Sequence, residues 1–444
     1  MIARKCLGLC RHSAPSGRGK LCARTYSTSA KRHPVHPEHL CESVWSRVPK
    51  GPMDPILGVT VKFLADSAPN KLNLGVGTYR DENGHSYVLP CVREAEARLH
   101  QQDIDHEYTC IGGAERFNNL AASLAFGETS PLILNRQIAT VQTLSGTGAL
   151  HIGADFLKSW LPNLRYIHYS TPTWGNHIPI CLGSQLEPKR YRYYDSVNIA
   201  IEEDNMLEDL NDAPSSSVIM LQVSAHNPTG IDPSRELWKK ISEVCKTKKH
   251  LVFFDLAYQG FATGNTDNDA WPIRYFVEQG HLPLVSQSFA KNFGLYGQRV
   301  GALHVATANP TEAESVKSQL ELIIRPQYSS PPIHGARIVS TILGDPVLKN
   351  MWKKDVRHMA DQIKNIRQLF VSQLKQAGST RDWSHITKQI GMFCYTGLKE
   401  EECRDLAELY HIYMTLDGRA SIPGISKNTV GYLADSIAKV THYQ

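Results

Sequence analysis

The chain has 444 residues, 41% of them hydrophobic and 20% charged, which is the composition of a soluble globular protein with more than one domain. The formal net charge of +5 arises in residues 1–37, which hold eight Lys or Arg and no acid; the rest has 40 basic and 43 acidic residues. We therefore expect no nucleic-acid partner, and no apolar run approaches the roughly 20 residues of a membrane span.

Residues 1–30 are predicted to be a mitochondrial presequence. They are rich in Arg and Ser, free of acids, and lack the apolar core of a secretory signal. At about 100° per residue, Ile2 and Leu9 lie opposite Arg4 and Arg11, the amphipathic form of such signals. A basic tail without a targeting role is the alternative. The pattern favours the mitochondrial matrix.

The rest of the chain is predicted to form an arm and two domains. Residues 31–53 run into a Pro-rich stretch and are expected to be an extended N-terminal arm. Residues 87–358 are expected to form the larger domain, and residues 54–86 with 359–444 the smaller one. Ten cysteines without a C-x-x-C pair indicate neither a disulfide framework nor a metal site.

From about residue 85 to 358, short β-branched runs alternate with longer amphipathic stretches. This alternation is typical of βαβ units and predicts an α/β fold with a mostly parallel central sheet flanked by helices. A long helix is predicted from about Pro346 to Gly378. The predicted strands are residues 138–143, 166–169, 217–223, 251–255, 284–288 and 300–306.

Polar residues follow these strands, at the sheet edge where ligands of open α/β sheets bind. Ser145-Gly146-Thr147-Gly148 precede a helix expected to begin near Ala149, and helix N-termini favour phosphate. The spacing excludes a Rossmann dinucleotide-binding site, because His151 occupies the position of the third glycine in that motif. An ordinary tight turn stays open as the alternative.

The next strands end in a carboxylate, a phenol and a lysine. Asn227 follows the third predicted strand, and Asp255 and Tyr258 follow the fourth. A structural capping role stays open for these residues at this point. Lys291 lies just past the fifth, with Arg299 eight residues on and no acid beside the lysine in sequence. Cationic neighbours disfavour the ammonium form, which would make the neutral amine available as a nucleophile.

Five stretches in order resemble the fold-type-I aspartate aminotransferases. The resemblance runs from about residue 45 to the C-terminus and is nearest to the mitochondrial branch. It implies pyridoxal 5'-phosphate as cofactor, reversible ping-pong transfer of an amino group between L-aspartate and 2-oxoglutarate, and a homodimer with sites at the subunit boundary. The stretches are residues 141–150, Pro172-Thr173-Trp174-Gly175-Asn176-His177, 225–230, 254–261 and 288–301.

The resemblance assigns a role around the cofactor to each matching residue. Lys291 would condense with the cofactor aldehyde and then move the proton, and Asp255 would keep the pyridine nitrogen protonated. Tyr258 and Asn227 would bind the ring oxygen, and Trp174 would stack on the ring. The phosphate would be bound by Ser145, Gly146, Thr147, Ser288 and Arg299 of one subunit and by Tyr108 of the other.

Substrate binding is assigned in the same way. Arg419 matches the residue that binds the α-carboxylate, with help from the N–H of Gly77 and from Trp174 and Asn227. Arg325 matches the residue that reaches the side-chain carboxylate from the partner subunit. A buried guanidinium should reject substrates without a second carboxylate, because its charge would be unpaired. The partners are thus dicarboxylic amino and keto acids.

Three positions depart from the family pattern. The loop after Tyr108 lacks the usual Leu-Pro, Gln222 replaces a histidine common behind Asp255, and Ser330 replaces a common Asn, whereas His226 is retained. Among enzymes of this fold, the alternatives are a decarboxylase and an aminotransferase that prefers aromatic donors such as kynurenine. Activity on kynurenine or aromatic amino acids is also expected as a secondary activity. The alternative that is not an enzyme is a non-catalytic relative retained as a binding or scaffold protein.

Overall fold

The computed structural model describes residues 43–81, 84–102 and 105–442. The predicted presequence 1–30 and the first part of the predicted arm 31–53 lie outside them. The chain divides into two compact units, Met1–Pro52 and Met53–Gln444. Every helix and strand among the described residues belongs to the second unit.

Among the described residues, a seven-stranded sheet of order β2-β10-β9-β8-β7-β3-β4 forms the centre of the second unit. All neighbours are parallel except β10, which is antiparallel to both β2 and β9. The α/β class with a mostly parallel sheet is thereby confirmed. The strands are β2 (Ile138–Leu144), β3 (Tyr166–Thr171), β4 (Glu187–Arg192), β7 (Val218–Gln222), β8 (Leu251–Leu256), β9 (Leu284–Ser288) and β10 (Val300–Ala306).

The six predicted strands are confirmed to within two residues at either end, and β4 was missed. This strand lies at the edge of the sheet, and of its six residues only Tyr191 is fully buried. Its sequence, Glu-Pro-Lys-Arg-Tyr-Arg, has no apolar alternation because most of its side chains never enter the core.

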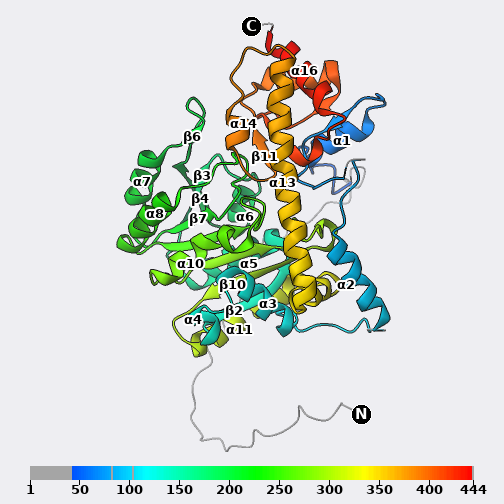
Figure 1. Ribbon diagram of the computed structural model, residues 1–444. Helices are drawn as coiled ribbons and strands as arrows, with labels where there is room; N and C mark the ends of the chain where they lie inside the picture. Colours follow the sequence, from blue (N-terminus) through cyan, green and yellow to red (C-terminus); the bar gives the residue numbers. More distant parts are fainter. Residues whose placement is uncertain (1–42, 82–83, 103–104, 443–444) are drawn as a thin grey trace, which may run out of the picture. The chain divides into compact units, whose positions relative to one another are not determined.

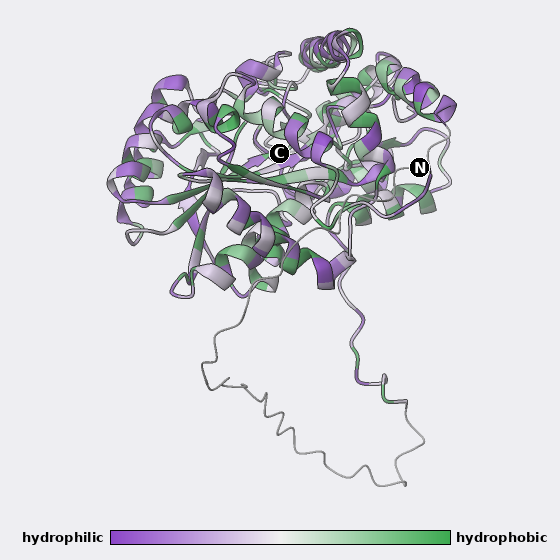
Figure 2. Ribbon diagram, turned by 90° about the horizontal axis from the view of Figure 1, so that it is seen from below, coloured by the Kyte–Doolittle hydropathy of each residue, from purple (hydrophilic) through white to green (hydrophobic). Residues whose placement is uncertain are grey.

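Both faces of the sheet are buried, as expected of parallel strands. On β7, Ile219 and Leu221 pack with residues of α8 and α10, whereas Val218 and Met220 pack with residues of α5 and α11. Figure 2 shows the green strands between two layers of helices. The helices include α3 (Glu115–Phe126), α4 (Pro131–Leu134), α5 (Ser145–Trp160), α6 (His177–Gly183), α7 (Glu203–Asp212), α8 (Arg235–Thr247), α9 (Thr266–Asp269), α10 (Trp271–Glu278) and α11 (Pro310–Tyr328).

A third apolar cluster surrounds the long helix α13 (Pro346–Gln376), which was predicted to reach Gly378 (Figure 1). Asp345 caps its first turn through the N–H groups of residues 347 and 348, and Pro346 suits the first helical position. The helix packs on α2 (Pro90–Gln101), α12 (His334–Leu343), α14 (His385–Lys388) and α16 (Val430–His442). It thus connects the sheet region with the C-terminal part of the chain.

Segments from both ends of the second unit pair with each other. Strand β1 (Leu72–Asn73) lies parallel to β12 (Ile412–Tyr413), and β11 (Phe393–Tyr395) lies antiparallel to β13 (Arg419–Ser421). Helices α1 (Leu57–Ala65) and α15 (Glu400–Tyr410) pack against the β1–β12 pair, and β5 (Tyr194–Asp195) pairs with β6 (Ala200–Ile201) elsewhere. The division into 54–86 with 359–444 and 87–358 stays a prediction. None of the helices in the described residues is long and apolar enough to span a membrane.

A buried histidine inside the sheet should make stability depend on pH. Burial lowers the pKa of His304 from 6.5 to about 3, while its ring contacts Thr140 Oγ1 and Gln287 Oε1, each at 3.0 Å. The unfolded chain takes up this proton below about pH 6.5 and the folded chain does not, so stability falls as pH falls. Between pH 8 and pH 5, wild type should lose about 2 kcal/mol more than His304→Gln. Urea unfolding at both pH values measures this, and equal losses would contradict it.

Candidate active site

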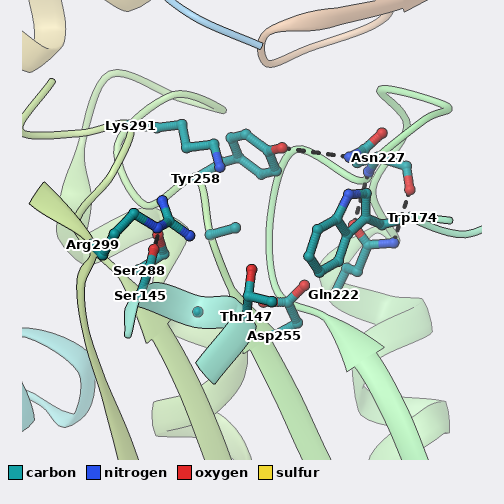
Figure 3. A pocket seen from close by; sticks show the side chains of 12 residues that line it. Ser145, Thr147, Trp174, Gln222, Asn227, Asp255, Tyr258, Ser288, Lys291 and Arg299 are labelled. Carbon is teal, nitrogen blue, oxygen red and sulfur yellow. Dashed lines mark hydrogen bonds between the residues drawn. The ribbon is translucent and has the colours of Figure 1, made fainter. Parts of the chain in front are cut away.

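The predicted site residues gather at one edge of the sheet, where β2, β7, β8 and β9 end. Because β10 is antiparallel, its first residue lies at the same edge and brings Arg299 there. They surround a cavity, called here the cofactor cavity (Figure 3). It is lined by Ser145, Gly146, Thr147, Trp174, Gln222, Asn227, Asp255, Ala257, Tyr258, Ser288, Lys291 and Arg299. All predicted cofactor-binding residues except Tyr108 are among them.

One side of the cavity is built to receive an anion. Helix α5 begins at Ser145, four residues before the predicted start, so its first turn itself lines the cavity. No side chain among the described residues caps this end, which leaves backbone N–H groups for a ligand. The hydroxyls of Ser145 and Ser288 lie 2.9 Å apart beside the Arg299 guanidinium (Figure 3).

Two backbone features bring these groups together. Ser145 and Arg299 adopt left-handed conformations, with φ of 62° and 50°, which cost of order 1 kcal/mol or more in a non-glycine residue. Gly301 on β10 lets the start of α5 approach, because a Cβ there would lie 2.4 Å from the Ser145 carbonyl carbon. Such strain is held where the surrounding structure over-determines it.

The surroundings of Lys291 disfavour its ammonium form. Burial lowers its pKa from 10.5 to about 8, Arg299 and Arg419 act in the same direction, and Asp255 opposes them. The direction is the one predicted from the sequence, although burial, and not the neighbouring cations, is the larger cause. Its Nζ lies 5.5 Å from the centre of the Tyr258 ring. Burial raises the pKa of Tyr258 above its usual range, so its hydroxyl stays protonated at neutral pH.

Asp255 is buried, and its partner is His177. His177 Nε2 lies 3.1 Å from Asp255 Oδ2, and Nδ1 lies 2.8 Å from Thr173 Oγ1. The ring nitrogens of His226, the retained histidine, contact the hydroxyls of Ser170 and Thr229 and not Asp255. His177 lies within one of the matching stretches, but it received no role from the sequence.

Gln222 is a further residue of the site that received no binding role from the sequence. Its Nε2 donates to the Asn227 carbonyl at 3.0 Å, and its Oε1 accepts from the Asn227 N–H at 2.9 Å (Figure 3). Asn227 in turn contacts Tyr258 Oη at 3.5 Å and Arg419 Nη1 at 3.3 Å. A carboxamide can satisfy both backbone groups at once, so this replacement of histidine preserves a hydrogen-bonded network.

Arg419 borders a second cavity, the outer chamber, which shares Trp174 and Asn227 with the first. The chamber is lined mainly by residues 53–62 and 413–419. Arg419 is 4% exposed, donates to the Gly75 carbonyl at 2.7 Å, and has an unpartnered buried Nε among the described residues. Gly77 lines neither cavity and packs against Phe393, whose ring lies 4.3 Å from the guanidinium carbon of Arg419.

Two predicted residues line neither the cofactor cavity nor the outer chamber of this chain. Tyr108 is 85% exposed, and Arg325 is exposed on α11 and donates to the hydroxyl of Ser329. Ser330, one of the departures, donates its N–H to the Tyr328 carbonyl at 2.7 Å in the turn that follows. Both Tyr108 and Arg325 were predicted to serve the site of a partner subunit.

The charge balance of the site fits pyridoxal phosphate and a carboxylate substrate. Among the described residues, no carboxylate lies within ion-pair distance of Lys291, Arg299 or Arg419, and Asp255 faces His177. The α5 end with Arg299 would hold a phosphate, and Asp255 would face a ring nitrogen. Arg419 keeps one buried donor, Nε, without a partner among the described residues, and an anion from outside the chain could satisfy it.

Comparison with known proteins agrees with this geometry. Residues 69–437 match the family model described as Aminotransferase class I and II. The chain is 51% identical over 397 residues to the mitochondrial aspartate aminotransferase of Dictyostelium discoideum, covering 89% of this chain and 93% of the relative. The structure of a mitochondrial aspartate aminotransferase from Trypanosoma brucei matches with a TM-score of 0.84 and 43% identity, covering 86% of this chain and 100% of that one. An aromatic-amino-acid aminotransferase from Burkholderia pseudomallei, covalently bound to pyridoxal phosphate, matches with a TM-score of 0.86 and 38% identity, covering 90% and 100%.

The lowered pKa of Lys291 makes its labelling testable. In cofactor-free protein, Lys291 should be neutral in about half of the molecules at pH 8 and in about one hundredth of them at pH 6. Only the unprotonated amine attacks an aldehyde, so labelling should follow this fraction. Pyridoxal phosphate followed by borohydride should label Lys291 at pH 8, far less at pH 6, and not at all in Lys291→Arg. Peptide mass spectrometry locates the label. Equal labelling at both pH values would contradict the assignment.

Proposed function

The chain belongs to the aminotransferase class I and II family, and we propose that it exchanges the amino group between L-aspartate and 2-oxoglutarate, with pyridoxal 5'-phosphate as cofactor. The observation that carries this proposal is a set of three cationic side chains, Lys291, Arg299 and Arg419, which surround a buried carboxylate and have no acid partner within the described part of the chain. A phosphate and the carboxylate of an amino acid would neutralise the two guanidinium groups. The amine is then left to react.

The chain's own groups would divide the work of the reaction. When bound, pyridoxal phosphate supplies an aldehyde that condenses with amines and a ring that withdraws electrons from the amino-bearing carbon. Lys291, neutral in a large fraction at pH 8, can accept a proton from that carbon and return it. Asp255, oriented by His177, would keep a positive charge on the ring nitrogen. Trp174 would cover the ring face.

Arg419 would fix the substrate by its α-carboxylate. Its Nη2 is held by the Gly75 carbonyl and its Nη1 by Asn227, which leaves Nε without a partner among the described residues. The N–H of Gly77, which packs against the same Phe393 ring as Arg419, stays a proposed second donor. Oxaloacetate and glutamate would leave from the same position in the two half-reactions.

We further propose a homodimer in which each site takes residues from both subunits. Tyr108 of the partner subunit would complete the phosphate site, and Arg325 of the partner subunit would bind the second carboxylate of the substrate. The exposure of both side chains outside their own cavity supports this assignment. A second guanidinium would give the site its preference for dicarboxylates over substrates with one carboxylate.

The relatives of this chain include mitochondrial enzymes, which implies a mitochondrial location. Within the mitochondrion we propose the matrix, where the basic, acid-free residues 1–30 would direct the chain. A secondary activity on aromatic donors or kynurenine is proposed as well. It is supported by the likeness to an aromatic-amino-acid aminotransferase and by apolar residues of the outer chamber such as Met53, Ile56 and Met414.

The reaction can be followed by absorbance. Cofactor-loaded protein should be yellow, lose its visible band on adding aspartate and regain it on adding 2-oxoglutarate, because each half-reaction converts the cofactor between aldehyde and amine forms. Steady-state kcat/KM should favour aspartate over tyrosine and kynurenine by at least about 100-fold, since these lack the second carboxylate. Colourless protein would indicate a non-catalytic relative. A preference for an aromatic donor would overturn the substrate assignment.

Sharing of residues between subunits can be tested by complementation. Lys291→Ala and Arg325→Asp homodimers should each be at least about 100-fold less active on aspartate, and Arg325→Asp should still bind cofactor. Co-expressed, the two chains should recover about a quarter of wild-type activity, because half of the dimers contain one intact site. Recovery no greater than that of the parents would show that Arg325 does not act across the subunit boundary.

A further inference from the structure

One wall of the outer chamber is formed by residues of α1 and by the residues before it. This helix is weakly anchored by apolar packing: of its nine residues only Gly58 and Val59 are buried. Leu57, Val61 and Leu64 are 63%, 55% and 71% exposed. Since a surface helix is usually held by a broad apolar face, other contacts must determine the position of this one.

The inner face of α1 nevertheless lies against the backbone that anchors Arg419. Gly75 admits Val59, because a Cβ at position 75 would lie 2.6 Å from Val59 Cγ1. The carbonyl of the same Gly75 accepts the 2.7 Å hydrogen bond from Arg419 Nη2. Displacement of α1 would therefore remove the packing on the residue that orients the guanidinium.

A polar cluster at the C-terminal end of α1 holds the helix in place. The carboxylate of Asp66, the residue after the helix, accepts hydrogen bonds from Tyr413 Oη and His411 Nδ1, both at 2.7 Å, and from the Ala68 N–H at 2.8 Å. The Asp66 side chain is 12% exposed. The Tyr413 hydrogen bond, with those of Ala68 and His411, lowers the pKa of Asp66 to about 2, so the carboxylate is charged at neutral pH.

A second group strengthens the same end of the helix. Lys71 Nζ donates to the carbonyls of Phe63 and Asp66, and lies 4.7 Å from the centre of the Phe63 ring. A cation there satisfies carbonyls that the end of a helix leaves unpaired. The cluster joins the α1 end to β12, and the chain reaches Arg419 six residues after Tyr413.

We propose that Asp66, through Tyr413 and His411, is a positioning residue for substrate: it fastens α1 as the wall of the outer chamber and thereby holds the Val59–Gly75–Arg419 contacts that bind the α-carboxylate. The inference rests on the proposed function, because it requires that Arg419 bind a carboxylate. The cofactor cavity is built from the ends of β2, β7, β8 and β9, so it does not depend on this cluster.

The test uses cofactor-loaded dimers of Asp66→Asn and Asp66→Ala, with Asp361→Asn on α13 as a matched control whose side chain is 61% exposed. Maleate, an unreactive dicarboxylate, is titrated against the cofactor absorbance, and amide hydrogen exchange is measured over residues 57–65. Asp66→Ala should weaken maleate binding about tenfold and speed exchange in α1, and Asp66→Asn should do so less because it retains one acceptor. Tyr413→Phe should weaken binding about threefold, and Asp361→Asn should match wild type.

Cofactor affinity and exchange in β7, β8 and β9 should be unchanged in every variant, which separates a positioning role from general destabilisation. Wild-type maleate affinity and α1 exchange in both Asp66 variants would overturn the inference, as would faster exchange throughout the sheet. Failure of the wild-type protein to bind maleate at all would instead refute the proposed function.

Discussion

The site depends on an imbalance of charge that the protein alone does not neutralise. Among the described residues, Lys291, Arg299 and Arg419 lack acid partners, while the one carboxylate lining the cofactor cavity, Asp255, is oriented by His177. Burial together with the two guanidinium groups lowers the pKa of Lys291 to about 8, and the same positive field favours an anionic cofactor and an anionic substrate. The two guanidinium groups thus contribute to both the lowered pKa of the amine and the preference for anions, although burial is the larger cause of the pKa shift.

The directions of the strands bring these groups to one edge of the sheet, and Arg299 reaches that edge only because one strand is antiparallel. Parallel strands place their carboxyl ends at one edge, which explains the positions of Asn227, Asp255 and Lys291. Arg299 precedes its strand instead of following it, and it reaches the edge because β10 runs in the opposite direction. The left-handed conformations of Ser145 and Arg299 and the close approach allowed by Gly301 then complete the anion-binding side.

Cofactor and substrate regions are joined through Asn227. Gln222 forms two hydrogen bonds with the backbone of Asn227, and the Asn227 side chain contacts both Tyr258 and Arg419. The Gln222 amide nitrogen also lies 3.5 Å from Thr173 Oγ1, and the same hydroxyl contacts His177. A neutral carboxamide at this junction adds no titrating group beside Asp255. On the other side, Arg419 is oriented by Gly75, which in turn packs against α1. The orientation of the Arg419 guanidinium therefore depends both on the position of a surface helix and on the hydrogen bonds around Asn227.

The sequence by itself determined the fold class and six strands, because strand periodicity is local and keeps its order along the chain. Its resemblance to a family also predicted cofactor-binding residues, which apart from Tyr108 line one cavity. The nucleophilic role of Lys291, inferred from its cationic neighbours, stays a prediction. It missed β4, whose polar side chains carry no burial pattern, and it placed the start of α5 four residues late because Ser145 begins the helix from a left-handed conformation. Only the tertiary structure decided that His177, and not His226, contacts Asp255, that Gln222 holds Asn227, and that Asp66 meets residues 411 and 413. These contacts join residues up to 347 positions apart, and the direction of a side chain across such a distance depends on packing that no local pattern encodes.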